Sequence, residues 1–279
     1  MTDRVAPPDV DTLESIEAAA WADSYRSQPK PSPYRLETTV GPHGVALLGL
    51  TSIPWTEFNR AIGFTSEAAL SRSAIEAIRR WLQDNAASCW ALQLPDPMLD
   101  AALLATFRDA GLERRGRDLA KLRRGLGDPG DGSATTVEIR EVGTDRSSDF
   151  AQTVQVGFGA PPLLAETFMT LPGRAGWRTY VAYDGDLPIA CGALFIQGSL
   201  AWLGIGATRP EWRGRGAQSA LIRRRIRDGL AAGVRTFTAE TGVPVPGQER
   251  NAVSFNNLRR AGFELAYKRG NFGPAVAAG

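Results

Sequence analysis

The chain has 279 residues, of which 43% are hydrophobic and 22% are charged, so it can bury a sizeable core and is not intrinsically disordered. Its length predicts roughly two domains, and its longest apolar runs are too short to cross a membrane. The net charge of +2 is unevenly spread, because residues 1–132 carry −3 and residues 133–279 carry +5. An anionic ligand is therefore sought first in the second half.

The small numbers of histidines and cysteines limit the kinds of metal and catalytic site that the chain can form. His43 is the only histidine, which argues against a histidine-based metal site or a Ser-His-Asp triad, so we expect no metal. Cys89 and Cys191 lie in apolar runs far apart, and we expect two free thiols. The first residues contain two acids and two prolines and show no secretory signal, so a cytoplasmic location is expected.

In the first half, hydrophobic periodicity predicts three helices, and turn residues separate four strands. The second helix carries Ile75, Ile78 and Leu82 on one side and arginines on the other. In chain order we expect a helix at 11–26, strands at 34–40 and 45–50, a helix at 71–87, a strand at 88–94, a helix at 100–110 and a strand at 112–122.

Residues 126–134 are dominated by Gly, Pro and Asp and are interpreted as a linker between a domain at 1–125 and a second domain at 135–279. The second domain alternates strands and helices. In chain order we expect a strand at 137–142, helices at 147–156 and 162–171, strands at 178–183, 189–196 and 201–207, a helix at 217–232, a strand at 234–240, a helix at 252–261 and a strand at 264–269.

The two halves share a faint repeat. The pattern Arg-x-Ala-Gly-x-Glu occurs at 108–113 and again at 259–264, and the elements around it follow the same order, which favours an ancient duplication. One string of the first half, residues 58–64, has two interpretations. It shapes an acceptor pocket, or it packs in the core next to a turn.

The loop at 213–218, Arg-Gly-Arg-Gly-Ala-Gln, joins a strand to a helix. Glycines let the backbone approach a ligand closely, and the free amides and the dipole of a helix N-terminus favour an anion such as a polyphosphate. The alternative is an ordinary tight turn with two solvated arginines and no ligand. A P-loop is excluded because no Gly-Lys-Ser/Thr follows, and the glycine spacing disfavours a Rossmann loop.

Two blocks resemble the GNAT acyltransferase superfamily. Residues 208–217, which include Arg213, Gly214 and Gly216, are similar to its acetyl-CoA pyrophosphate loop. Residues 251–263, an Asn eleven residues before a Gly-Phe, are similar to its next helix. The resemblance covers about residues 135–273 and is faint over 1–125. It implies a mixed α/β fold with a mostly antiparallel central sheet flanked by helices, here in tandem with a degenerate N-terminal copy.

The resemblance also implies the ligand and its site. Acetyl-CoA would be the cosubstrate and a small amine the acceptor, and no nucleic acid or membrane partner is expected. Backbone amides of the loop would hold the pyrophosphate, amides of the preceding strand the thioester, and the next helix the pantetheine or adenosine. The residues expected to bind the cosubstrate are Ala207, Thr208, Arg213, Gly214, Arg215, Gly216, Ala217, Gln218, Asn251 and Ser254.

This sequence departs from the family pattern at two positions. Gln218 replaces the usual small residue of the loop, and Leu258 stands where many members place a tyrosine general acid. A proton for the leaving thiolate would then come from water or Tyr267. Glu240, at the end of the strand after the loop helix, is the candidate general base. The alternative for Glu240 is a pair with an arginine or a cap of the next turn.

The resemblance predicts an N-acetyltransferase that acts by direct attack of an amine on the thioester. Leu258 favours the alternative, a non-catalytic acyl-CoA sensor or regulatory module. A basic face on helix 217–232 suggests nucleic-acid binding, but no aromatic side chains interleave with it, and the near-neutral net charge argues against it. In the first half, residues 67–70 align with 213–216 and contain one acid and no glycine, so pyrophosphate binding there is not expected.

Overall fold

A computed structural model describes residues 10–32, 34–130 and 137–275, which fold into two compact units. Unit 1 comprises Met1–Lys121 and Ala266–Gly279, and unit 2 comprises Leu122–Leu265. The last part of the chain therefore groups with unit 1, whereas the second domain expected from sequence runs to residue 279. Part of the expected linker, residues 131–134, lies outside the described residues.

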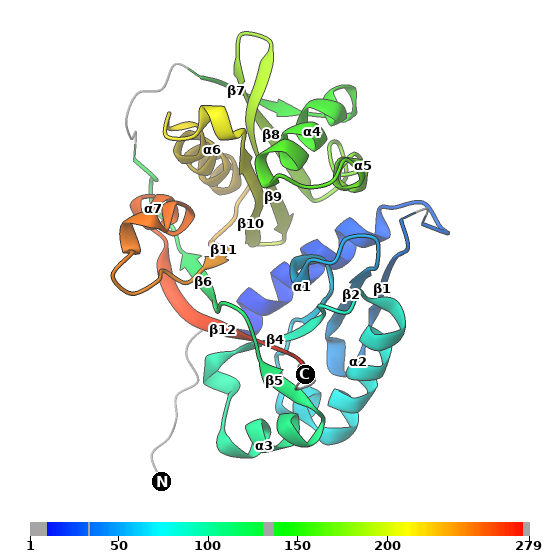
Figure 1. The fold of residues 1–279 in the computed structure, drawn as a ribbon. Coiled ribbons are helices and arrows are strands. Elements are labelled where there is room, and N and C mark those ends of the chain that lie inside the picture. Colours follow the sequence, from blue (N-terminus) through cyan, green and yellow to red (C-terminus); the bar gives the residue numbers. More distant parts are fainter. Residues whose placement is uncertain (1–9, 33, 131–136, 276–279) are drawn as a thin grey trace. The chain divides into compact units, whose positions relative to one another are not determined.

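Unit 1 is a mixed sheet with helices on both faces (Figure 1). Its strands follow the order β1-β2-β3-β4-β12, and β5 pairs with β12. The pairings are antiparallel except that between β3 and β4, which is parallel. The helices are α1 (Val10–Arg26), α2 (Arg72–Asn85) and α3 (Ala101–Asp109), and the strands are β1 (Leu36–Val40), β2 (Ala46–Leu50), β3 (Arg60–Ile62), β4 (Ala91–Pro95), β5 (Leu112–Arg114) and β12 (Glu264–Pro274).

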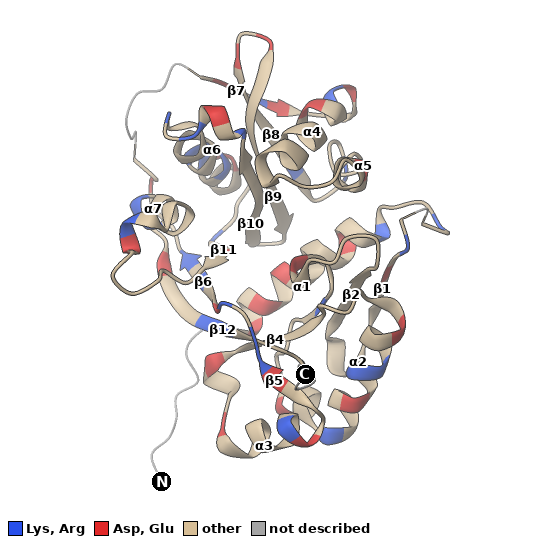
Figure 2. Cartoon of the chain, viewed as in Figure 1, with Lys and Arg blue, Asp and Glu red and all other residues tan. Residues whose placement is uncertain are grey.

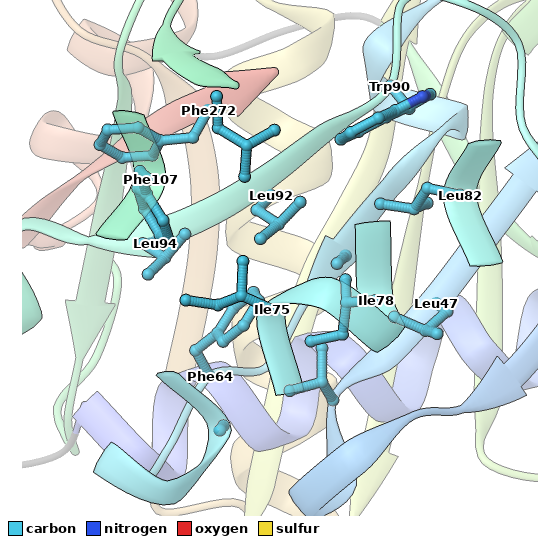
Figure 3. Packing of buried hydrophobic residues seen from close by; sticks show 14 of the residues in the cluster. Leu47, Phe64, Ile75, Ile78, Leu82, Trp90, Leu92, Leu94, Phe107 and Phe272 are labelled. Carbon is cyan, nitrogen blue, oxygen red and sulfur yellow. The ribbon is translucent and has the colours of Figure 1, made fainter. Parts of the chain in front are cut away.

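The apolar core of unit 1 follows from strand alternation. Successive residues of a strand point to opposite faces, and one face of β4 presents Leu92 and Leu94 to α2 and α3. The rings of Phe107 and Phe272 lie 4.8 Å apart at an interplanar angle of 55°, at one end of this cluster (Figure 3). The expected stripe of α2 is confirmed, because Ile75, Ile78 and Leu82 are fully buried here.

The opposite face of the same strands carries a buried polar layer. Arg60, Gln93 and Asn271 come from neighbouring strands and form a chain: Arg60 Nη1 donates to Gln93 Oε1 (2.7 Å), and Gln93 Nε2 donates to Asn271 Oδ1 (2.7 Å). Helix α1 packs beneath β1 and β2 and supplies the acids that meet this layer; Figure 2 marks acidic residues along α1. Polar groups without water need such partners, since each unpaired one is costly.

Five ionisable side chains of this layer form what we term the buried ion network: Glu14, Glu17, Arg60, Lys121 and Arg269. Each is at most 2% exposed. Arg269 Nη2 donates to Glu14 Oε1 (2.7 Å) and to Glu17 Oε2 (3.2 Å), and Lys121 donates to Glu17. The network joins residues more than 250 positions apart along the chain.

The string at residues 58–64 is packed in unit 1 as the core interpretation predicts. Phe58 is 6% exposed and Phe64 is fully buried. The Asn59 side chain satisfies four backbone groups: Nδ2 donates to the carbonyls of Ile53 and Trp55, and Oδ1 accepts from the amides of Leu50 and Ala87.

Unit 2 is also a mixed sheet, with α6 on one face and α4 and α5 on the other (Figure 1). Strands β7 to β10 pair antiparallel in chain order, and β10 pairs parallel with β11, next to which lies β6. The strands are β6 (Leu119–Arg124), β7 (Glu138–Val142), β8 (Trp177–Asp184), β9 (Leu187–Gln197), β10 (Leu200–Thr208) and β11 (Thr236–Gly242), and the helices are α4 (Ser147–Phe158), α5 (Leu163–Phe168), α6 (Ala217–Ala231) and α7 (Val253–Arg260).

The structure corrects three of the expected elements. The strand expected at 112–122 is two strands, β5 and β6, because a turn containing Gly116 interrupts it. Strand β3 was not expected, since it is three residues long and begins with the buried Arg60. Strand β12 continues to Pro274, five residues beyond the expected end, because Arg269 to Phe272 pair with β4.

Candidate functional site

Strands β10 and β11 separate within unit 2. Their parallel pairing covers Leu200–Leu203 of β10 against Thr236–Ala239 of β11 and then stops, although both strands continue. Strand β10 stays paired with β9 as far as Thr208, opposite Ala190. The end of β10 therefore loses one neighbour and keeps the other, which leaves strand edges open toward a ligand.

A β-bulge lies in the part of β10 that β11 has left. Gly204 is opposite Ala193 and Ala207 is opposite Cys191, so two residues of β10 face the single Gly192 of β9. One of the two, Ile205, has a φ of +52°, which is rare for a β-branched residue. Bulges of this kind redirect the backbone groups of a strand next to functional sites.

Helix α6 begins directly after the glycine loop. Gly214 and Gly216 have φ of +80° and +83°, a conformation that glycine adopts without the strain of a Cβ. Gly216 is the N-cap and supplies no side chain to the helix, so the first amides of α6 have no capping partner there. Gly214 and Gly216 are both exposed, and the loop offers free N–H groups at the positive end of a helix dipole.

The two loop arginines have different partners. Arg213 Nη2 donates to the carbonyl of Gly157 at the end of α4 (2.8 Å), so this side chain ties the loop to α4. The Arg215 guanidinium lies 4.4 Å from the centroid of the Trp212 ring and is exposed. Arg215 is therefore the loop arginine that faces solvent, and it has no carbonyl or carboxylate partner in the described part of the chain.

The corresponding helix of unit 1 is closed to an anion. Helix α2 follows β3 as α6 follows β10, but its N-cap is Ser71, whose side chain accepts from the amide of Ala74 (3.3 Å). Just after β3, the amide of Gly63 donates to Glu14 Oε2 (3.3 Å), a carboxylate of the same unit. In unit 1, therefore, an amide at the start of the helix and the amide just after the strand each donate to a side chain of the same unit.

Helix α7 packs against α6 and β11. Asn251 and Ser254, expected to bind the cosubstrate, are both exposed at its start. Ser219, in the first turn of α6, has its hydroxyl 3.3 Å from Asn257 Oδ1 and joins the two helices. Leu258, at the position of the family tyrosine, is 6% exposed and lies in the core.

The candidate acid–base groups lie in different places. Glu240 is the first residue of β11 beyond its last pair with β10 and is half-buried, with a polar partner. Tyr267 belongs to unit 1, where its hydroxyl donates to Glu14 Oε1 (2.7 Å). Burial raises the pKa of the Cys191 thiol to about 12, so it is protonated at neutral pH and is a poor nucleophile.

Two residues near the bulge, Gly157 and Arg225, are not among those expected from sequence. A Cβ on Gly157 would lie 2.8 Å from Ala207 Cβ, so glycine lets α4 approach the end of β10. Gln218 and Arg225 of α6 bond to backbone carbonyls beside the bulge. The sequence predicts a contact for the backbone amide of Gln218 and none for its side chain, and it places Arg225 on the basic helix at 217–232. The signal available in sequence was Arg225's place one turn from the apolar Leu221 and Ile222.

No helix among the described residues is long and apolar enough to span a membrane. In the same part of the chain, no group of three or more His, Cys, Asp or Glu side chains is arranged to hold a metal ion.

Part of the chain matches the model of a known protein family, and its fold resembles solved structures. The model of the GNAT acetyltransferase domain matches residues 113–244. A GCN5-related N-acetyltransferase from Kribbella flavida has a TM-score of 0.63 and 14% identity, over 95% of this chain and 96% of that chain. A tandem GNAT protein from the clavulanic acid biosynthesis pathway has a TM-score of 0.58 and 15% identity, over 99% and 98%. No curated protein matches the sequence.

Residues 113–244, which contain the bulged strand and the glycine loop, therefore match the GNAT acetyltransferase domain. The structural likeness, at such low identity, shows the fold, and the expected mixed and mostly antiparallel sheet is confirmed. The matched family supports acyl transfer in general.

Proposed function

We propose that this chain transfers an acetyl group from acetyl-CoA to the amine of a small molecule. The observation that carries the proposal is the combination, within unit 2, of an uncapped helix N-terminus and a bulged strand that separates from its neighbour. The first feature suits a pyrophosphate and the second a thioester with its pantetheine arm. In the part of unit 1 that the structure describes, α2 and α3 are capped by the side chains of Ser71 and Asp100, so we expect unit 2 to hold the active site.

The residues present fit this cosubstrate. Thr208 Oγ1 is buried at the end of β10 and has no hydrogen-bond partner within the described part of the chain. Such a group calls for a partner, and a bound ligand supplies one. In the proposed complex, amides of the loop from Arg213 to Gln218 hold the pyrophosphate, Ala207 and Thr208 receive the thioester end, and Asn251 and Ser254 line the pantetheine or adenosine. Acetyl-CoA supplies an activated acyl group when bound.

The proposed transfer is direct. The amine nitrogen forms a bond to the acyl carbon, the carbon–sulfur bond breaks, and the amine gives up a proton. Glu240 is proposed as the base for that proton, because it follows the last paired residue of β11. Water is proposed as the proton donor to the thiolate, since the Tyr267 hydroxyl is bound to Glu14. The raised pKa of Cys191 disfavours an acyl-enzyme on that thiol.

The rival proposal is a non-catalytic acyl-CoA sensor, which the buried Leu258 at the family tyrosine position favours. Incubation of the chain with acetyl-CoA and a panel of primary amines distinguishes the two, with free thiol as the readout. We expect thiol release above background with at least one amine, and a lower rate in Glu240→Gln. Binding of acetyl-CoA without thiol release across a broad panel would contradict catalysis and support the sensor.

A further inference from the structure

The bulge of β10 requires support from its surroundings. Ile205 has a left-handed φ of +52°, a conformation that is strained for a β-branched residue and persists only where the surroundings hold it. The neighbouring strand β11 gives no support, because its pairing with β10 ends at Leu203. The residues that hold this backbone in place must therefore come from β9 or from the covering helices.

Gln218 of α6 holds one end of the bulge. Its Nε2 donates to the carbonyl of Ala207 (2.6 Å) and to the carbonyl of Cys191 (3.0 Å). Ala207 and Cys191 are the facing pair at which regular pairing resumes after the bulge. One amide group therefore spans the two strands at that point, and it belongs to the first turn of the helix whose amides face the loop.

Arg225, two helical turns further along α6, holds the other end. Its Nη1 donates to the carbonyls of Gly204 (3.2 Å) and Ala193 (3.0 Å), the last facing pair before the bulge. Gly192, the single residue opposite the bulge, leaves room for the guanidinium, since a Cβ there would lie 2.7 Å from the Arg225 Cζ.

Burial of the charged Arg225 side chain costs desolvation that a residue serving only to fill space would not incur. Arg225 is 3% exposed, and within the described residues its hydrogen bonds go to the backbone carbonyls of Leu221, Ala193 and Gly204 and to no carboxylate. Burial lowers its pKa to about 10, so it still carries its charge at neutral pH. An apolar side chain would fill this space with less desolvation, which indicates that the hydrogen bonds to the bulge are what this position provides.

We propose that Gln218 and Arg225 are positioning residues that clamp the two carbonyl pairs flanking the bulge and so fix Gly204–Thr208 in the conformation that receives the acyl end of the donor. The inference rests on the proposed function. It gives α6 two roles: its N-terminal amides meet the pyrophosphate, and two of its side chains shape the strand that meets the thioester.

The test compares two probes by calorimetry, acetyl-CoA and its nucleotide fragment adenosine 3′-phosphate 5′-diphosphate, which ends at the pyrophosphate. In Arg225→Met and in Gln218→Leu, we expect affinity for acetyl-CoA to fall about tenfold or more while affinity for the fragment stays within about threefold. Arg225→Lys should recover part of the loss. Arg224→Met is the matched control, because the Arg224 side chain is 40% exposed and bonds to Asp228 and to the carbonyl of Ile139, neither of which belongs to the bulge. Equal weakening of both probes, or of neither, would overturn the proposal.

A second readout needs no ligand. Hydrogen exchange of the backbone amides of Gly204–Thr208 should be faster in both variants than in the parent chain, whereas exchange in β8 should be unchanged. Unchanged exchange at the bulge would overturn the proposal even if the parent chain bound neither probe, a result that would contradict the proposed function instead. If Arg225→Met does not fold, Gln218→Leu, at a half-buried position, carries both measurements.

Discussion

Replacement of Glu14 by alanine is expected to lower the free energy of unfolding by about 3–5 kcal/mol, because it removes one partner of a buried ion network. Glu14 Oε1 accepts from the Tyr267 hydroxyl and from Nε and Nη2 of Arg269, and Oε2 accepts from the amide of Gly63. Glu14 and Arg269 are both fully buried. The variant would remove one of the two carboxylates that pair with the buried guanidinium of Arg269 and leave the other, Glu17, in place.

Chemical denaturation followed by circular dichroism measures this loss. Asp11→Ala is the matched control, because Asp11 lies one turn earlier on α1 and its side chain is exposed. Its removal should cost no more than about 1 kcal/mol, the size of a helix-dipole contribution. If both variants lost the same small amount, the buried ion network would not be a main source of stability in unit 1.

Replacement of Gly216 by aspartate is expected to weaken acetyl-CoA binding by about 100-fold or more. The new carboxylate would stand at the N-cap of α6, accept from the free amides and repel the pyrophosphate. Nothing lies within 4 Å of a Cβ at this position, so the change itself meets no steric barrier beyond the strain of the φ of +83°. Calorimetric titration with acetyl-CoA measures the effect.

Gly233→Asp is the matched control for that variant. Gly233 follows the other end of α6, has a φ of +87° and is equally open, so the substitution introduces the same residue with the same backbone strain. Gly233→Asp should lose at least as much thermal stability as Gly216→Asp, because a carboxylate is favourable at a helix N-cap and unfavourable at the C-terminal end, but it should bind acetyl-CoA like the parent chain. Comparable weakening in the two would show that the loop at Gly216 is not the pyrophosphate site.

Local sequence patterns predicted most elements because each depends on neighbours along the chain. The stripe of Ile75, Ile78 and Leu82 specifies a helix with one buried face, and it packs as expected. The loop at Gly214 and Gly216 was also predictable from sequence, since glycines before an amphipathic helix indicate positive φ angles and an open helix N-terminus. These features were predicted without knowledge of any partner distant in sequence.

The features that sequence did not predict depend on partners far away in the chain. Glu14 resembles any acid on an amphipathic helix, and its role appears only when β12 brings Arg269 beside it. Arg225 lies one turn from the apolar Leu221 and Ile222 but has arginines on either side of it in the helix, and its carbonyl partners on β9 and β10 are brought to it only by the fold. The assignment of the C-terminal strand to unit 1 also depends on a distant partner, because β12 joins that unit through pairs with β4 such as Asn271 opposite Gln93.

The contrast between the units bears on how the two halves relate. In each, a helix follows the strand that pairs parallel with a later strand, and in each a second helix and strand follow. In unit 1, Ser71 caps the helix and Glu14 takes the amide of Gly63, whereas Gly216 leaves the helix of unit 2 uncapped. The predicted duplication, with one copy that has lost its anion site, remains our interpretation of this pattern.

Calorimetric titration of the parent chain with acetyl-CoA tests whether unit 2 alone holds a cosubstrate site. We expect saturable binding with one site per chain, since the N-terminus of α6 and the end of β10 are open in unit 2, whereas in unit 1 Ser71 caps α2 and Glu14 accepts from the amide of Gly63. A titration with no saturable binding, or one that fits two equivalent sites per chain, would contradict this expectation.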